Sequence, residues 1–306
     1  MRTVLVVGSS NTDMVIRVPR VPRPGETVLG GEFSMAAGGK GANQAVAAAR
    51  AGGRVRLVAR VGDDVFGERA VRGFEADGID VRFVVRDGRA PSGVALINVA
   101  ADGENSISVA SGANALLSSD DIRRAGEAFD GADVLLLQLE TPLETVRAAA
   151  ATASERGIPV ILNPAPARPL GDDLLRCVAV LTPNESEAEV LTGIRVAGEK
   201  GAAAAAAALR ARGPRLVVVT LGEKGCYAAG EDFTGFVPSF PVRAVDTTAA
   251  GDVFNGALAV ALAEGRPVRE VLRFASAAAA ISVTRPGAQP SAPTQDEISA
   301  FLKSEA

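Results

Sequence analysis

The 306-residue chain contains no histidine, no tryptophan, one tyrosine and two cysteines. Without an imidazole the protein cannot build a Ser-His-Asp triad, a Cys-His pair or a zinc-binding HExxH helix. Any catalytic proton must therefore move to or from aspartate, glutamate, lysine, tyrosine or cysteine. The cysteines, Cys177 and Cys226, lie far apart in apolar runs and match no metal-binding spacing. We expect both to be reduced residues of the core of a cytosolic protein.

Long apolar runs are missing as well. No window approaches the length of a membrane span, and residues 1–8 lack the apolar stretch and cleavage site of a signal peptide. The net charge is −4, and the basic residues are dispersed rather than gathered in a stripe that would bind nucleic acid. These features predict a cytoplasmic protein whose partner is a small molecule, not a membrane or a nucleic acid.

The chain does contain short β-branched runs that alternate with longer alanine-rich, helix-periodic runs. This alternation is typical of repeated βα units around a mostly parallel sheet. The expected strands are 4–8, 55–61, 134–139, 160–162, 178–182 and 216–220, and the expected helices are 41–51, 66–77, 143–155, 185–192, 202–212, 251–263 and 268–283. The predicted fold class is α/β, with a mostly parallel central sheet flanked by helices.

Two stretches interrupt this rhythm. Residues 14–33 are rich in proline, and residues 94–110 alternate apolar and polar side chains around Asp102 and Gly103. Both patterns are typical of antiparallel strands with a hairpin turn. We expect them to pair as a small antiparallel β lid over the site. No flexible linker divides the sequence, so residues 1–306 are expected to form a single domain into which 14–33 and 94–110 are inserted.

A first cluster of polar residues, 8–13, follows the first predicted strand. In open α/β sheets, ligands bind at the carboxyl ends of the strands. Asp13 can accept hydrogen bonds from two adjacent hydroxyls, and Asn11 can both donate and accept, as polyol binding requires. An Asx turn explains the same residues without a ligand, and for this motif alone it is the simpler interpretation.

A second motif, residues 38–43, opens an alanine-rich helix. Three glycines within four positions allow a ligand to approach the backbone, and the helix start adds exposed N–H donors. The spacing is not that of a Walker loop, because Ser34 replaces the first glycine and Gly41 replaces the Ser/Thr that would meet Mg²⁺. A tight turn is the alternative, but Lys40 and Asn43 favour sugar binding.

The third motif, residues 246–252, precedes a helix and consists mainly of small residues. Unobstructed N–H groups at a helix start can stabilise the negative charge of a phosphoryl group in transfer. Asp252 lies in the first turn, where the helix dipole favours its ionised form, and can take the proton of an attacking hydroxyl. Its alternative role is that of a helix cap.

These motifs together resemble the PfkB carbohydrate kinase family. The matching stretches extend over essentially the whole chain and are residues 8–13, 38–45, 162–167, 182–185, 246–252 and 283–291. The motif around Asp252 is typical of the whole family. The first two motifs and the last stretch are similar to those of the members that phosphorylate ribose.

The resemblance implies an ATP-dependent kinase that phosphorylates the 5-hydroxyl of D-ribose to give D-ribose 5-phosphate. It also implies Mg²⁺, an activating K⁺ ion and a homodimer that pairs through the lid. Kinases for 2-deoxyribose, fructose or adenosine remain alternatives, as does a non-catalytic sugar-binding protein on the same scaffold. A nicotinamide oxidoreductase is disfavoured, because residues 8–10 lack the second glycine of the dinucleotide fingerprint.

The resemblance further implies roles for individual positions. The sugar would contact Asn11, Asp13, Gly38, Gly39, Lys40, Asn43 and Glu140. Asp252 would be the general base, and Ala249, Ala250 and Gly251 would form the anion hole. ATP would be lined by Asn184, Thr220, Leu221, Gly222, Glu223, Lys224, Gly225, Gly251 and Ser276, and Glu187 would organise Mg²⁺ through water. The monovalent cation would be held by Asp246, Thr248, Ser282, Arg285, Gly287 and Ser291. The Arg285 side chain, expected to be buried, cannot ligate a cation, so its carbonyl would serve.

Two positions depart from the family pattern. Ala249 stands where glycine is commoner, and because alanine is still small we expect the anion hole to survive. Ser276 stands where some members have a histidine near the adenine, which changes the expected base stacking. Glu140 and Asn184 have alternative roles as caps of the helices that follow them.

Overall fold

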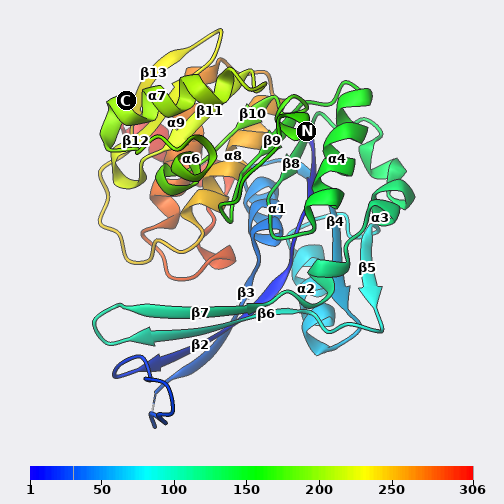
Figure 1. Cartoon of the computed structure of the whole chain (residues 1–306), viewed down its shortest axis with the longest axis vertical. Coiled ribbons are helices and arrows are strands. Elements are labelled where there is room, and N and C mark those ends of the chain that lie inside the picture. The colour runs from blue at the N-terminus through cyan, green and yellow to red at the C-terminus, as the bar shows by residue number, and fades with distance from the viewer. Residues whose placement is uncertain (30, 306) are drawn as a thin grey trace.

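A nine-stranded sheet forms the centre of the computed structural model, which describes residues 1–29 and 31–305 (Figure 1). Its strand order is β13-β12-β11-β10-β9-β8-β1-β4-β5. The strands are β1 Thr3–Val7, β4 Arg54–Gly62, β5 Val84–Asp87, β8 Val134–Leu137, β9 Val160–Leu162, β10 Val180–Leu181, β11 Leu216–Thr220, β12 Gly225–Ala229 and β13 Thr234–Pro238. Seven neighbouring strands of this order are parallel, namely β11, β10, β9, β8, β1, β4 and β5, and β12 and β13 add an antiparallel edge.

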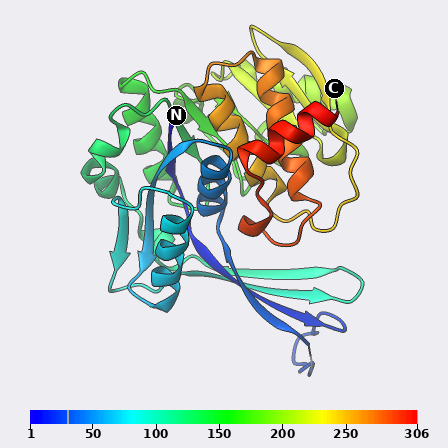
Figure 2. The same ribbon diagram turned by 180° about the vertical axis from the view of Figure 1, so that it is seen from behind.

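Helices cover both faces of this sheet, and alternate residues of each strand supply two separate cores. Val4 and Val6 face one core, whereas Leu5 and Val7 face the other. The first face packs against α1 Lys40–Arg50, α2 Val65–Ala76, α8 Ala250–Ala263, α9 Val268–Ser282 and α10 Gln295–Ser304 (Figure 2). The second packs against α3 Ser119–Arg124, α4 Leu143–Glu155, α5 Asp172–Leu175, α6 Glu185–Thr192 and α7 Gly198–Arg210. The predicted fold class is confirmed.

A second sheet projects from this body, in the order β3-β2-β6-β7 (Figure 1). Its strands are β2 Asn11–Val18, β3 Phe33–Gly38, β6 Gly93–Ala100 and β7 Asn105–Ala110. The two outer pairs are antiparallel, as predicted, but β2 and β6 pair in parallel. β2 and β6 both start at the body and run outward, so they are parallel. The hairpin patterns did not predict this pair, because they describe antiparallel strands only. Gly30, within the predicted segment 14–33, and Ala306 lie outside the described residues.

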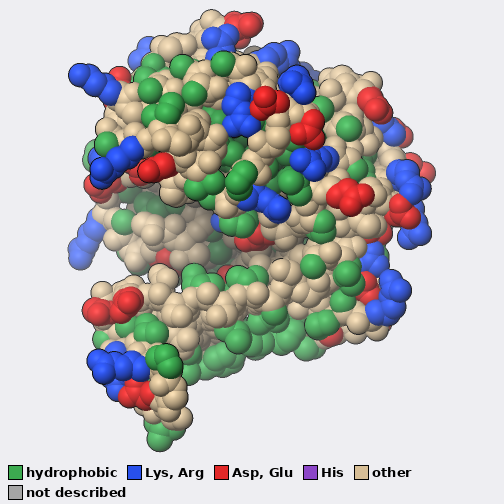
Figure 3. Space-filling view, viewed as in Figure 1, with side chains coloured by type: hydrophobic (Ala, Val, Ile, Leu, Met, Phe, Trp, Pro, Cys, Tyr) green, Lys and Arg blue, Asp and Glu red, His purple; other side chains and the backbone are tan. Residues whose placement is uncertain are grey.

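A cleft separates the small sheet from the body (Figure 3). The register places Asp13, Ala95 and Val109 on the face of the small sheet that carries the polar motif. The opposite face carries an apolar strip made of Met14, Ile16, Phe33, Met35 and Leu96. Within the described residues, no helix has both the length and the apolar character needed to cross a membrane.

Some elements differ from the sequence-based prediction. Asn11 and Asp13 belong to β2 rather than to a loop, and α7 begins at Gly198, four residues before the predicted start at residue 202. The β12–β13 hairpin and the short β5 were not predicted, because their few residues give no clear period. Cys226 is buried as expected, whereas Cys177 is only partly buried.

Candidate active site

The site lies where α1 and α8 begin, beside the carboxyl ends of β1 and β8 to β10. The two helices approach closely at Gly256: a Cβ there would lie 2.6 Å from Ala47 Cβ and 2.7 Å from the Gln44 carbonyl oxygen. Only glycine allows this approach, and it brings the first turn of α1 against the first turn of α8. The sequence thereby places Asn43 and Gln44 beside Asp252.

Asp252 is held by two side-chain amides from α1. Asn43 Nδ2 donates to its Oδ2 atom and Gln44 Nε2 donates to its Oδ1 atom, each at 2.9 Å. Only 6% of Asp252 is exposed. Burial raises the pKa of Asp252, although Lys40 and the two amides act in the opposite direction. The result is a fixed carboxylate with an increased affinity for a proton, which suits a general base.

The backbone just before Asp252 forms an open helix start. Ala249, the residue before α8, has φ = 59°, in the left-handed region that costs alanine about 1–2 kcal/mol. This conformation explains why glycine is commoner here in the resembled family. Among the described residues, the amides of Gly251 and Asp252 have no hydrogen-bond acceptor, and Ala250 N–H donates to the Thr247 carbonyl at 3.3 Å. The free amides of Gly251 and Asp252 can therefore bind an anion.

Two glycines bring the start of α1 against β2. A Cβ at Gly38 would overlap the Asp13 carboxylate, and one at Gly39 would lie 2.7 Å from the backbone nitrogen of Asn11. Gly39 also has φ = 88°, which disfavours other residues. The structure thus brings the first two sequence motifs together.

Glu140 joins this group from the end of β8. Its Oε2 atom accepts from Ser9 Oγ at 2.6 Å and from the Lys40 backbone N–H at 2.9 Å. The alternative that Glu140 caps the helix that follows it is wrong, because it binds the first residue of α1 and Pro142 precedes α4.

Asn11 is oriented by a residue that the sequence reasoning missed. Asn114 Nδ2 donates to Asn11 Oδ1 at 2.8 Å and to the Ser10 carbonyl at 3.0 Å, and Asn114 Oδ1 accepts from Ser10 N–H at 2.8 Å. Because the oxygen of Asn11 is engaged, its amide nitrogen is left as a donor for a ligand. Asn114 follows β7, so no local pattern connects it to Asn11.

The charges of the site are strongly coupled. Burial, together with the carboxylates of Glu140 and Asp252, raises the pKa of Asp13 to about 6. Burial works to lower the pKa of Lys40, but Asp252, Glu140 and Glu187 together raise it. Lys40 is therefore a cation that three carboxylates stabilise by charge attraction.

The expected nucleotide residues lie at the ends of β10 and β11. Asn184 caps α6 through a capping box: its backbone N–H donates to Glu187 Oε2 at 2.8 Å, and its Oδ1 atom accepts from Glu187 N–H at 2.8 Å. The cap predicted as an alternative is present. Thr220 N–H donates to the Pro183 carbonyl at 2.9 Å, so residues 220–225, between β11 and β12, begin beside Asn184. Ser276 is buried on α9, which packs against α8.

The expected cation residues come from two loops that Asp246 joins. Its carboxylate accepts from Thr248 N–H at 2.9 Å and from Gly287 N–H at 2.8 Å. Burial acts to raise the pKa of Asp246, but these hydrogen bonds outweigh burial and lower the pKa below its ordinary value. The hydroxyls of Ser282 and Ser291 are buried and donate to carbonyls of their own turns.

The expectation that the Arg285 side chain is buried is wrong. It is 36% exposed and forms an ion pair with Glu297 of α10 at 2.6 Å. The pair satisfies the guanidinium at the surface. The group expected to ligate the cation is still the backbone carbonyl of Arg285 and not its side chain.

A magnesium ion fits this site only when water and phosphate supply most of its ligands. Among the described residues, no group of three or more Asp, Glu or Cys residues is arranged to hold a metal. Glu187 is the carboxylate next to the nucleotide residues, and Mg²⁺ commonly keeps several waters. The residues present therefore fit a water-mediated ion.

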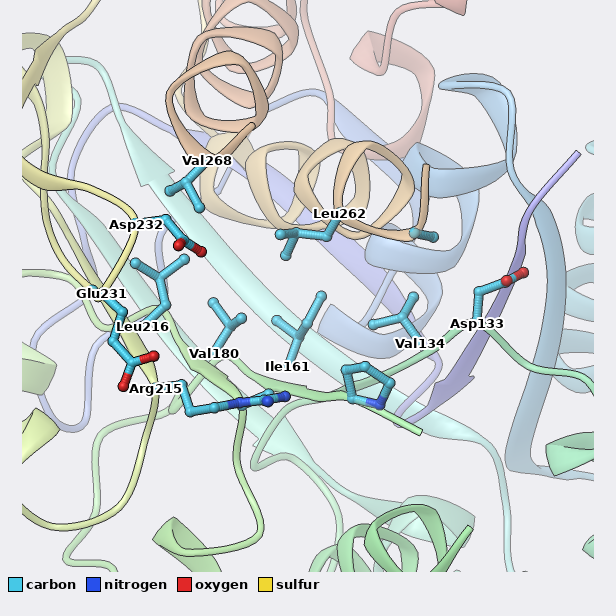
Figure 4. Close-up of a pocket in the computed structure, with 14 residues that line it drawn as sticks. Asp133, Val134, Ile161, Val180, Arg215, Leu216, Glu231, Asp232, Leu262 and Val268 are labelled. Atoms are coloured by element: carbon cyan, nitrogen blue, oxygen red, sulfur yellow. The ribbon is translucent and has the colours of Figure 1, made fainter. Parts of the chain in front are cut away.

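A separate cavity of about 280 Å³ lies at the opposite edge of the sheet (Figure 4). Val134, Ile161, Val180 and Leu216, at the amino ends of their strands, point into it together with Leu262. No residue of the three sequence motifs lines it. The residues of the three motifs thus gather at the carboxyl edge and not at this cavity.

Comparison with known proteins agrees with this geometry. A family model described as "pfkB family carbohydrate kinase" matches residues 1–295. The chain belongs to the pfkB family of carbohydrate kinases. It is 46% identical to a ribokinase of Haemophilus influenzae over 99% of both chains and 40% identical to a deoxyribokinase of Salmonella typhi over 98% of both. The solved structure of Arabidopsis thaliana ribokinase complexed with ribose and ATP is 34% identical, covers 99% of this chain and 98% of its own, and has a TM-score of 0.90.

In this carbohydrate kinase, the sequence reasoning also missed a group of buried polar residues. A buried polar group lies between the strand ends and the two helices and consists of Gln44, Gln138, Asn163, Thr182 and Asn255. A signal was present in the sequence, because Gln138, Asn163 and Thr182 each follow a buried apolar run directly. Their mutual contacts depend on strand order, which the sequence does not state.

Proposed function

We propose that the protein transfers the γ-phosphoryl group of ATP to the 5-hydroxyl of D-ribose. The observation that carries this proposal is the position of Asp252, a buried carboxylate next to free helix-start amides and to the cluster that contains Asp13. One carboxylate can then accept a proton where the amides stabilise the transferred phosphoryl group. The Arabidopsis relative named as a complex with ribose and ATP supports the choice of both substrates.

The mechanism follows from the contacts. Asp13 and Asn11 hold ring hydroxyls, and Gly38 and Gly39 allow the sugar to reach the backbone. Asp252 takes the proton of the 5-hydroxyl, whose oxygen attacks the γ-phosphorus in line while the bond from this phosphorus to the β–γ bridging oxygen breaks and ADP leaves. The free amides of Gly251 and Asp252 stabilise the charge on the phosphoryl oxygens, and the predicted part of Ala249 and Ala250 requires the Ala250 N–H to turn from the Thr247 carbonyl toward the phosphoryl group. The positive charge of Lys40 reduces the repulsion among the nearby carboxylates.

The nucleotide and its metal complete this proposal. Asn184, Gly251, Ser276 and residues 220–225 line ATP, as the resemblance implies. Bound Mg²⁺ supplies charge neutralisation of the phosphates, with Glu187 orienting its water. Asp246, Thr248 and Gly287 already join two loops, so K⁺ held there, with Ser282, Ser291 and the carbonyl of Arg285, would fix the orientation of the anion-hole amides.

A steady-state assay of ADP release tests the function. We expect turnover with D-ribose at a higher kcat/KM than with 2-deoxyribose, fructose or adenosine, because a sugar without one hydroxyl leaves an acceptor of the site unpaired. The deoxyribokinase among the relatives makes 2-deoxyribose the second candidate. K⁺ is expected to raise kcat. Absence of ADP release with every sugar would contradict the assignment, and preference for 2-deoxyribose would transfer it to that substrate.

The small sheet is the proposed lid and dimer contact. Its face opposite Asp13 carries the apolar strip, in which Phe33 is 61% and Leu96 is 54% exposed (Figure 3). Pairing of two such faces would cover this surface and the edges of the sheet. A lid closed over the cleft would also keep water from the phosphoryl group.

Light scattering tests the dimer. We expect a dimer at micromolar concentration, and we expect Leu96→Asp to convert it to a monomer because it buries a charge in the contact. Val65→Asp, a substitution of an exposed apolar residue at the start of α2, is the matched control and should remain dimeric. A wild-type monomer, or a dimeric Leu96→Asp variant, would rule out this contact.

We place the reaction in the cytoplasm. ATP is supplied there, and the two cysteines are free thiols, which that compartment keeps reduced.

A further inference from the structure

Gln44 connects the proposed base to the sheet through buried side-chain amides. Its Nε2 atom donates to Asp252 Oδ1 at 2.9 Å and to Asn163 Oδ1 at 3.0 Å. Asn163 Nδ2 donates in turn to the Thr182 carbonyl at 3.1 Å. Gln138 Nε2 completes the environment by donating to Gln44 Oε1 at 2.6 Å. Gln44 thus uses both of its N–H donors and its oxygen.

The same chain of hydrogen bonds returns to α8. Thr182 Oγ1 donates to Asn255 Oδ1 at 2.6 Å, and Asn255 Nδ2 donates to the Gly251 carbonyl at 2.8 Å. The Gly251 carbonyl and the Asp252 N–H belong to one peptide group. A hydrogen bond that fixes this carbonyl therefore also fixes the direction of an anion-hole amide.

The orientation of every side chain in this path is determined. A main-chain carbonyl and a carboxylate only accept, so the amide nitrogens of Asn163, Asn255 and Gln44 must face them. Gln44 has no exposed surface, and Thr182 and Asn255 are each 1% exposed. Gln44 is rigid in such surroundings, because breaking any of its bonds leaves a buried group unpaired, although the Oε1 atom of Gln138 has no partner among the described residues.

We propose that Gln44 is a positioning residue for phosphoryl transfer and that Asn163, Thr182 and Asn255 link it to the anion hole, so that Asp252 and the amide ahead of it move as one unit. This inference rests on the proposed function, since it deepens the role of the same site. Apart from Asp252 and the Gly251 carbonyl, the side chains of Gln44 and its partners bond none of the residues predicted to bind substrate. They therefore act through Asp252 and the main chain.

The hydrogen bond from Gln44 favours the ionised form of Asp252. The other charged groups that face this carboxylate are Lys40 from α1, Glu140 after β8, Glu187 from α6 and Asp13 from β2. Removing the Gln44 donor leaves all four in place. Burial raises the pKa of Asp252 and the hydrogen bond from Gln44 lowers it. Because the substitution removes the hydrogen bond and leaves the burial, the pKa of Asp252 must rise further.

The first test is Gln44→Met, which keeps the length of the side chain and removes its donors and acceptor. In the pH profile of kcat/KM we expect the acidic limb to move upward by about one pH unit, the effect of one hydrogen bond to a charged group. We expect kcat to fall about 10- to 100-fold because the base loses its fixed position. KM for D-ribose should not change. Gln295→Met, an exposed substitution on α10, is the control and should leave the profile unchanged.

The second test is Thr182→Val, which removes only the hydroxyl that donates to Asn255. Both hydrogen bonds to Asp252 remain, so the acidic limb should stay where it is. We expect kcat to fall about 10-fold, because the Gly251–Asp252 peptide loses its support. This variant keeps the inference testable even if Gln44→Met does not fold.

A third measurement separates this inference from the proposed function. The ¹³C carboxyl resonance of Asp252, assigned by its loss in Asp252→Asn, reports ionisation without turnover, and we expect it to titrate at higher pH in Gln44→Met. If the wild type does not phosphorylate ribose, the proposed function fails while this titration still decides the link to Asp252. An unmoved titration, a loss of activity that is equal at every pH, or an unchanged kcat in Thr182→Val would overturn the inference.

Discussion

Asp252→Asn is expected to lower kcat by about 10²- to 10⁴-fold, the usual contribution of a general base, while the protein still folds and binds ribose. The substitution keeps the shape of the side chain and removes its ability to take a proton. Asn43 Oδ1 is buried and has no hydrogen-bond partner within residues 1–29 and 31–305, so a turned Asn43 amide can accept from the new side-chain amide. Steady-state kinetics with D-ribose and calorimetric ribose binding provide the measurement.

The stability of this variant supplies a separate check. Because the pKa of Asp252 is raised in the folded state, ionising this carboxyl costs stability as pH rises above its ordinary pKa. Asp252→Asn removes that cost, so its unfolding free energy relative to wild type should increase between pH 4 and pH 8. Asp296→Asn, in the exposed first turn of α10, should retain full activity. Near-normal turnover in Asp252→Asn would refute the assigned base.

Lys40→Met is expected to have the second largest effect. It removes a half-buried cation that the carboxylates of Asp252, Glu140 and Glu187 stabilise by charge attraction, and no other cation among the described residues replaces it in the cluster. Because its pKa is raised above 10.5, Lys40 is protonated throughout pH 5–8, so any change in its stabilising effect over this range comes from the carboxylates that ionise near it. In the variant the carboxylates repel one another as they ionise, so stability should fall as pH rises.

Urea unfolding at pH 5 and pH 8 measures this effect. The difference between Lys40→Met and wild type should be larger at pH 8, and kcat/KM should fall about 10²-fold because the base is displaced and its proton affinity increases. Lys200→Met, an exposed substitution on α7, is the control and should leave both properties unchanged. An equal loss of stability at both pH values would argue against electrostatic compensation.

Much of this arrangement could be predicted from local sequence. The apolar runs identify β1, β4 and β8 to β11, because strands buried on both faces contain few polar residues. Gly38 and Gly39 indicated a close approach to the backbone, and the structure shows that Asp13 and Asn11 occupy that space. Small residues before Asp252 indicated an open helix start, and within the described part of the chain the amides of Gly251 and Asp252 are free, whereas that of Ala250 donates to Thr247.

The rest depends on contacts between distant parts of the chain. Asn114 and Asn11 are 103 positions apart, and Gln44 and Asp252 are 208 apart, so no local pattern joins either pair. The parallel pairing of β2 and β6 likewise follows from where both strands leave the body. Arg285 was expected to be buried, but the packing of α10 sets its exposure and brings Glu297 beside it. No local pattern in the sequence reports this packing.

The tight crossing at Gly256 has a consequence for how such enzymes diversify. The two helices that hold Asp252 meet without free space, whereas the strands of the projecting sheet leave the body and border solvent beyond Asn11 and Asp13. Substitutions in those outer parts of the strands can alter how a sugar is held without disturbing the helix contact that fixes the reacting carboxylate. Selectivity for a new sugar is thus open to stepwise evolutionary change, while the apparatus for moving phosphate is inherited intact.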